Sequence, residues 1–162
     1  MRILVLSQYW APENGVPQRR WSWLSKILVQ AGHEVLVIAP PPHYQRRLGL
    51  KQWFSRRNVL GANDLEEGNS GEKILRSGFF PAGPSLTHRI LNQASVAGSM
   101  LFMQATKRKQ LKSFKPDLVI GTVPALPTAV VTQFVARILH TPYIIDLRDA
   151  WPELLKEKGD WN

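Results

Sequence analysis

The sequence contains no cysteine, so disulfide bonds and thiolate metal ligands are excluded within the chain. Its histidines are scattered and show none of the short spacings with which paired histidines bind a metal ion: His33, His43, His88 and His140. Two glycine signatures are also missing, G-x-G-x-x-G and G-x-x-x-x-G-K-[ST], which argues against a nicotinamide or P-loop nucleotide site. We therefore expect neither a metal centre nor a resident cofactor.

Long apolar runs are missing too. No stretch reaches the ~18 consecutive apolar residues that a membrane-spanning helix requires. The N-terminal residues have the character of a strand and lack the charged, apolar and cleavage regions of a signal peptide. The sequence therefore predicts a cytoplasmic protein.

Acidic residues are absent from two long segments, and the formal net charge of the whole chain is +9. None lies between Glu34 and Asp64 or between Glu72 and Asp117, and basic residues accumulate in both gaps. Charge segregated in this way predicts an anionic surface or ligand. Nucleic acid would be one such ligand, but the sequence has no recognition-helix, RNP or zinc signature. We expect no nucleic-acid partner.

The chain opens with an apolar run at residues 2–7, which is typical of a strand buried on both faces. A helical pattern covers residues 17–31, with Pro17 at the first helical position and Gly32 just past the end. A second apolar strand follows at residues 34–39. The segment between the two strands is long enough for the crossover of a parallel pair.

The rest of the chain continues this alternation. We expect strands at 73–76, 117–121 and 143–147, a long helix from Ser85 or Thr87 to about Phe114, a tight loop at 122–127, a helix ending at Leu139, and a surface loop at 61–71. The pattern predicts a single α/β domain, a Rossmann-like open parallel sheet with helices on both faces. Right-handed crossovers favour the strand order 3-2-1-4-5, with the switch point between the first and fourth strands.

In such a sheet, ligands bind beyond the carboxyl ends of the strands, near the switch point. This rule selects three loops, at residues 8–16, 122–126 and 146–153. The first loop meets a helix N-terminus, which favours an anionic ligand, and Gly15 would let that ligand approach the backbone closely. A role for Gly15 as a simple turn residue remains open.

Charged residues gather at the end of the last strand. Asp146, Arg148 and Asp149 follow an apolar run, and a carboxylate at a strand end can act as a general base beside an orienting arginine. The alternative is a structural ion pair in which Asp149 caps a short last helix. From spacing alone, the structural alternative is favoured.

Residues 43–57 interleave basic and aromatic side chains, among them Arg46, Arg47, Trp53, Phe54, Arg56 and Arg57. An arginine-rich segment with exposed rings suits an anionic membrane interface. The alternative is a solvated loop whose aromatic side chains pack back onto the domain.

Several motifs together carry a resemblance to a known family: RILVLSQYWAPE at 2–13, Gly15, GHEV at 32–35, PDLV at 116–119 and IDLRDAWPE at 145–153. They resemble the opening half of family 4 glycosyltransferases with the GT-B fold. Within that family they are closest to the branch that acts in bacterial surface-polysaccharide and lipid-linked sugar assembly. The resemblance extends over essentially the whole chain, and the last motif is specific.

The resemblance implies that residues 1–162 form the N-terminal, acceptor-side domain, and that the C-terminal donor-binding domain is absent. The implied activity is that of a retaining hexosyltransferase, which moves a sugar from a nucleotide-sugar donor to a lipid-linked or polysaccharide acceptor without a metal. The basic and aromatic residues at 43–57, with the basic end of the long helix, predict a peripheral position on the inner face of the plasma membrane. A cleft between two domains takes only half of its contacts from one of them, so we expect no activity of this chain alone. The alternative is a non-catalytic nucleotide- or sugar-binding module of the same architecture.

The same resemblance implies roles for single residues. Binding of the donor or substrate falls to the loops after two strands, at Asn14, Gly15, Val16, Thr122 and Pro124. Many members of the family have a His-Asp pair after the fifth strand, but this chain has Arg148-Asp149. The implied catalytic residues are therefore Asp149 and, beside it, Arg148.

Overall fold

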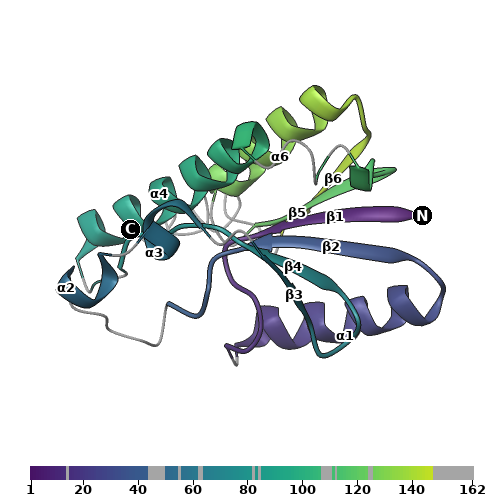
Figure 1. Cartoon of the computed structure of the whole chain (residues 1–162), viewed down its shortest axis with the longest axis horizontal. Coiled ribbons are helices and arrows are strands. Elements are labelled where there is room, and N and C mark those ends of the chain that lie inside the picture. Colours follow the sequence, from purple (N-terminus) through teal and green to yellow (C-terminus); the bar gives the residue numbers. More distant parts are fainter. Residues whose placement is uncertain are drawn as a thin grey trace, which may run out of the picture.

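The computed structural model describes residues 1–13, 15–43, 50–54, 56–61, 64–81, 83, 85–106, 111, 113–123 and 126–147. One sheet lies between helices on its two faces (Figure 1). Its strands are β1 (Arg2–Ser7), β2 (Glu34–Ala39), β3 (Leu65–Glu67), β4 (Lys73–Arg76), β5 (Leu118–Val123) and β6 (Tyr143–Leu147). The helices are α1 (Val16–Gln30), α2 (Leu50–Trp53), α3 (Arg56–Leu60), α4 (Leu86–Thr106) and α6 (Leu126–Leu139).

The strands lie in the order β3-β4-β2-β1-β5-β6. The predicted strands are β1, β2, β4, β5 and β6, and they are parallel to their neighbours in the predicted order, which is confirmed. The prediction for residues 61–71 was wrong in one respect, because β3 lies within this segment. β3 pairs antiparallel with β4 at the edge of the sheet. Glu66 of β3 forms an ion pair with Arg76 of β4, which links the two strands.

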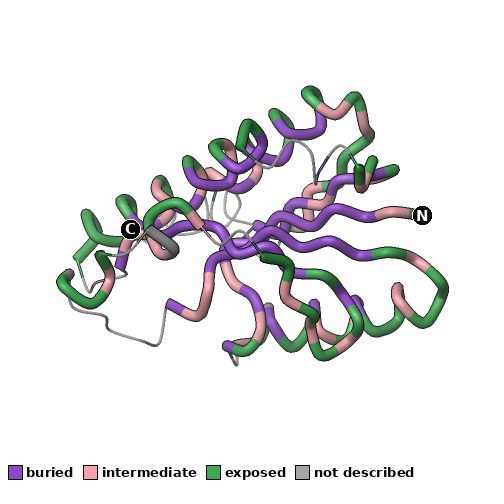
Figure 2. Tube along the Cα trace, viewed as in Figure 1, coloured by how far each residue is buried: buried purple, intermediate pink, exposed green. Residues whose placement is uncertain are grey.

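Alternate side chains of each central strand enter two separate cores, as the pleat of a strand requires. Ile3 and Val5 of β1 pack on the side of α1, in a cluster that includes Trp21. Leu4 and Leu6 pack on the opposite side, in a cluster with buried residues of α4 and α6. The central strands are buried along most of their length (Figure 2).

Two residues that the sequence predicted at helix ends, Ser85 and Gly32, lie at the start of α4 and just after the end of α1. The hydroxyl of Ser85 accepts a hydrogen bond from the backbone N–H of His88 (3.3 Å), so Ser85 caps α4. Gly32 follows the end of α1 with a φ of 82°, a left-handed conformation that favours glycine.

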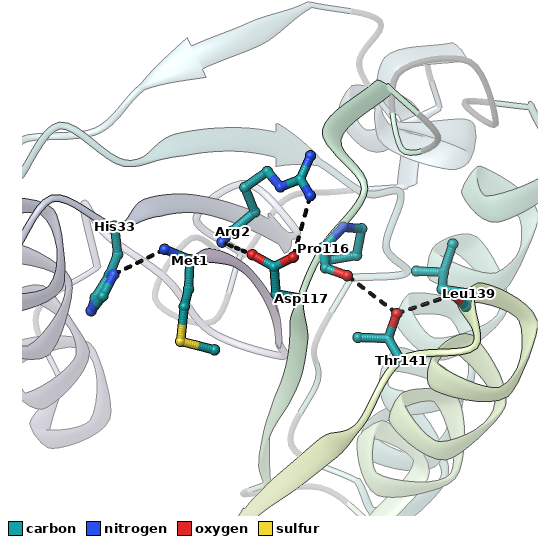
Figure 3. A network of polar contacts seen from close by, with 7 residues as sticks. All are labelled: Met1, Arg2, His33, Pro116, Asp117, Leu139 and Thr141. Atoms are coloured by element: carbon teal, nitrogen blue, oxygen red, sulfur yellow. Dashed lines mark hydrogen bonds and ion pairs between the residues drawn. The ribbon is translucent and has the colours of Figure 1, made fainter.

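Side chains at the amino edge of the sheet join the starts of β1 and β5 (Figure 3). The carboxylate of Asp117 accepts hydrogen bonds from the backbone N–H of Arg2 (2.7 Å) and from its guanidinium (3.2 Å). These hydrogen bonds hold the pKa of Asp117 below its usual value, and the bond from the Arg2 backbone has a larger effect than the bond from its side chain. The hydroxyl of Thr141 donates to the carbonyl of Pro116 (3.2 Å), which brings the start of β6 to the same edge.

Two glycines provide a test of the packing between β5 and α6. A Cβ on Gly121 of β5 would collide with the side chain of Thr132 on α6, whereas a Cβ on Gly98 of α4 would meet no atom within 4 Å. We expect Gly121→Ala to lower the free energy of unfolding by about 1–3 kcal/mol through overpacking. Gly98→Ala should leave it unchanged or raise it by about 0.5–1 kcal/mol through helix propensity. Urea denaturation measures both, and equal effects would contradict the prediction.

Candidate functional site

The switch point lies between β1 and β5. Ser7 at the end of β1 is the register partner of Thr122 in β5, and both residues are buried. Thr122 also pairs with Asp146 of β6, so Thr122 and Val123 belong to the strand and not to the loop that was predicted to begin at residue 122. Three adjacent strands therefore place hydroxyl and carboxylate side chains at one edge of the sheet.

The loop after β1 leaves the strand through a tight local turn. The hydroxyl of Ser7 donates to the carbonyl of Tyr9 (2.6 Å) and accepts from the N–H of the same residue (3.3 Å). Gln8 is buried, and its side-chain N–H donates to Oδ1 of Asn92 on α4 (2.9 Å). These hydrogen bonds fix the direction of the backbone at the start of the loop.

A buried guanidinium holds the middle of this loop. Arg76 donates from Nη2 to the carbonyl of Ala11 (2.9 Å) and from Nη1 to the carbonyl of Pro40 (3.2 Å). Its Nε donates to the carboxylate of Glu66 (2.8 Å), which supplies the opposite charge. A buried charge is tolerated only when it is paired and hydrogen-bonded. Arg76 therefore joins the loop after β1, the end of β2 and the edge strand β3.

His43, after β2, completes the support of the loop. Its backbone N–H donates to Oε1 of Glu13 (2.7 Å), and its ring stacks on Tyr9 with centroids 5.7 Å apart. The ring is buried, and this burial lowers the pKa of His43. The carbonyl of Pro41, the carboxylate of Glu13 and the amide of Asn92 oppose that shift in part. His43 is therefore an uncharged packing element near neutral pH.

The loop ends at the N-terminus of α1. Gly15 occupies the N-cap position with an extended backbone, φ −119°, and no described side chain caps the helix. The first turn of a helix presents N–H groups that have no partner within the helix, together with the positive end of its dipole. Pro17 contributes no N–H there, so Val16 and Gln18 carry the first-turn donors. This helix end suits an anionic group.

Asp146 links β6 to the same helix. Its carboxylate accepts a hydrogen bond from the indole N–H of Trp21 (3.0 Å) and forms an ion pair with Arg20. Asp146 is thus held by α1 and serves to fix the end of β6.

Other predicted site residues lie outside the described residues: Asn14, Arg46, Arg47, Pro124, Arg148 and Asp149. The backbones of Arg56 and Arg57 belong to α3, but their side chains are not described. Gly15, Val16 and Thr122 are the donor-site candidates that the structure places, and all three lie at the carboxyl edge.

The two aromatic residues of the basic segment differ in their surroundings. Trp53 packs against the core cluster that includes buried residues of α4, and its indole N–H donates a hydrogen bond to the carbonyl of Phe79. Its ring meets that of Phe80 edge-on, with the ring centroids 5.2 Å apart. Phe54 is 78% exposed. Phe54 is therefore the more exposed ring of this pair, and Trp53 is partly buried.

The sequence analysis did not identify four residues that support the site: Gln8, His43, Arg76 and Asn92. Each is a polar residue within or next to an apolar element, which is the one signal that could have identified them. Within the described residues, no group of three or more His, Asp or Glu side chains could hold a metal ion. No described helix is long and apolar enough to cross a membrane.

The buried ring of His43 predicts how stability depends on pH. Its pKa in the folded chain lies below the ordinary value of 6.5, so the unfolded chain binds a proton first as the pH falls. The stabilising effect of the neutral ring is complete above pH 6.5 and is lost as the pH falls toward the folded pKa. Urea unfolding at pH 7.5 and pH 5.5 should show this loss.

The matched variants are His43→Gln, which removes the buried group, and His140→Gln, which removes an exposed one. The difference between the two pH values should shrink in the first variant and persist in the second. A parent whose unfolding is independent of pH in this range would contradict the prediction.

No known family model matches the chain. Among curated proteins, the chain is 28% identical over 150 residues to WcaI of Escherichia coli (strain K12), which is provisionally assigned as a glycosyl transferase of colanic acid biosynthesis. That alignment covers 92% of this chain and 34% of WcaI, so the chain spans about a third of this relative.

Among solved structures, the fold is similar to sucrose-phosphate synthase from Thermosynechococcus elongatus, with a TM-score of 0.56 and 11% identity. This match covers 89% of the chain and 32% of the synthase. The C-terminal domain of a hydrogenase from Pyrococcus furiosus is also similar, with a TM-score of 0.51, 14% identity and 89% of each chain covered. At such identities the likeness concerns the fold, which proteins of different function share. The fold is that of a Rossmann-like domain.

Proposed function

We propose that the chain is the N-terminal, acceptor-side domain of a GT-B glycosyltransferase that takes a sugar from a nucleotide-sugar donor. The observation that carries this proposal is the loop after β1, which Arg76 and Gln8 hold so that α1 begins at the carboxyl edge of the sheet. A helix N-terminus in this position suits the diphosphate of a donor. The likeness to WcaI supports the same reading and favours a polysaccharide or lipid-linked acceptor.

In this proposal Gly15 and Val16 meet the diphosphate, and Asn14, Thr122 and Pro124 line the same edge. Asp149 acts as the base or as a hydrogen-bonding partner of a sugar hydroxyl, and Arg148 keeps its carboxylate ionised. Transfer proceeds with retention of configuration and without a metal. A site between two domains takes only half of its contacts from one of them, so the 162-residue chain alone should not turn over a donor.

A second function is a non-catalytic module that binds a nucleotide or a sugar with the same fold. The two functions are separated by donor turnover in the longer protein of which this chain would be one domain. Turnover by that protein supports the transferase, and binding of the donor without turnover supports the module.

The catalytic role of Asp149 is tested in that longer protein by Asp149→Asn. The substitution is nearly isosteric, so the melting temperature should stay close to that of the parent while the transfer rate falls about 10²–10⁴-fold. Asp117→Asn is the matched control, because Asp117 lies at the amino edge of the sheet and should leave the rate unchanged. A variant of Asp149 that retains more than a tenth of the activity would show that its role is structural.

The excess of basic residues supports a peripheral position on an anionic membrane, at the inner face of the plasma membrane. Each Lys or Arg near such a surface contributes about 1 kcal/mol, an attraction that salt weakens. Binding to liposomes should therefore rise with the fraction of anionic lipid and fall with salt.

Phe54 and Trp53 separate the aromatic part of this binding from folding. Phe54→Ser should weaken liposome binding with little effect on stability, because the ring is exposed. Trp53→Ser should mainly lower stability, because its ring packs on the core. Equal binding to neutral and anionic vesicles would rule out the electrostatic contribution.

A further inference from the structure

A pocket of about 470 Å³ lies on the flank of α1, between the loop after β1 and the turn that joins β3 to β4. The turn lies beside α1 in Figure 1. The described lining of the pocket shares residues 11–13 with the carboxyl-edge site but includes no residue of β5 or β6. Its volume is in the range of small-molecule sites. The pocket is therefore a place for a ligand apart from the switch point.

The wall opposite α1 is held in place by hydrogen bonds. The hydroxyl of Ser70 donates to the carbonyl of Ser22 on α1 (3.2 Å), and its backbone N–H donates to the carboxylate of Glu72 (3.0 Å). Gly71 has a φ of 86°, which favours glycine and lets the chain turn back into β4. A wall fixed in this way avoids part of the ordering cost of binding.

Trp23 lies in the other wall and is 63% exposed. An indole ring of this kind offers a large apolar face with a negative quadrupole. The weakly positive C–H groups on one side of a sugar ring are suited to pack against such a face. Trp23 is therefore a stacking platform.

Two cations flank this ring along the helix. Arg19 and Lys26 lie four residues before and three residues after Trp23, spacings that place side chains on one flank of a helix. Neither of them forms an ion pair with any described residue. The acidic residue in the described lining is Glu13, whose carboxylate accepts a hydrogen bond from the backbone N–H of His43. The pocket is net positive and suits a ligand that carries an anionic group.

Gln18, which also lines the pocket, is 8% exposed, and its Oε1 has no hydrogen-bond partner among the described residues. This oxygen is buried beside Gly15, so Gln18 lines the pocket with the rest of its side chain. Asn69 and Ser22 add further polar groups to the lining. The lining thus provides acceptors and donors for a hydroxylated molecule.

We propose that this pocket binds an anionic saccharide, a hydroxylated ring that carries a carboxylate or a phosphate. The ring stacks on Trp23, and the anionic group lies near Arg19 and Lys26. The choice of a saccharide over other hydroxylated anions rests on the proposed function. The pocket would hold a sugar unit apart from the one being transferred.

The test is a titration of the 162-residue chain followed by ¹H–¹⁵N NMR at the indole N–H of Trp23. The probes are digalacturonate, glucose 6-phosphate, maltose, inorganic phosphate and uridine diphosphate. At least one charged sugar should shift the Trp23 signal and bind more tightly than maltose and inorganic phosphate. The comparison of digalacturonate with glucose 6-phosphate identifies the anionic group. Binding of maltose or phosphate as tight as that of both charged sugars, or tighter binding of uridine diphosphate, overturns the proposal.

Variants at exposed positions show where the ligand binds. When Trp23 is changed, binding is followed by the NMR shifts of other backbone amides of α1. Trp23→Ala should weaken binding about fivefold, and Arg19→Gln or Lys26→Gln about threefold each. The matched controls on α6 are Phe134→Ala and Arg137→Gln, which remove an exposed ring and an exposed charge elsewhere. Controls as damaging as the pocket variants would overturn the assignment.

This outcome is independent of donor turnover. A longer protein that transfers sugar, with no binding of charged sugars to this pocket, removes the pocket proposal alone. Binding of charged sugars without any turnover in the longer protein removes the proposed enzyme activity alone.

Discussion

The guanidinium of Arg76 has donors on three nitrogen atoms, and each finds an acceptor in a different segment of the chain. Two acceptors are the carbonyls of Ala11 and Pro40, which belong to the loops after β1 and β2. The third is Glu66, whose strand β3 has only three residues and pairs with β4 alone. The Arg76 side chain is buried and that of Glu66 is 36% exposed, so loss of Glu66 would leave a buried cation with only carbonyl partners among these three acceptors. Arg76 therefore joins three segments at the carboxyl edge, whose support it shares with Gln8 and His43.

The two edges of the sheet differ in kind. At the amino edge, Asp117 and Thr141 bind backbone groups at the starts of neighbouring segments of the sheet. At the carboxyl edge, the polar contacts of Arg76 and Gln8 hold the loops that follow the strands. One edge thus maintains the sheet, and the other carries the positions where residue types can change with function.

The parallel sheet could be predicted because apolar runs define its strands and right-handed crossovers define their order. β3 could not, because Leu-Glu-Glu has no apolar period and its link to Arg76 lies ten residues further along the chain. The first loop was predicted from the fold rule, but its buried supports were not. Gln8 and Asn92 are 84 residues apart, and no local pattern connects them. The catalytic assignment of Arg148 and Asp149 came from a family motif and remains a proposal.

The contact between Asp146 and α1 makes two parts of the carboxyl edge mechanically interdependent. Arg20 and Trp21 lie one turn after the helix start that suits an anion, and they hold the strand end that precedes residues 148 and 149. A small rotation of α1 about its axis would be transmitted to β6, because the Arg20 guanidinium and the Trp21 indole N–H both contact the Asp146 carboxylate. Replacement of α1 by a helix of another protein would therefore also reposition the last strand, unless Arg20 and Trp21 are kept opposite Asp146.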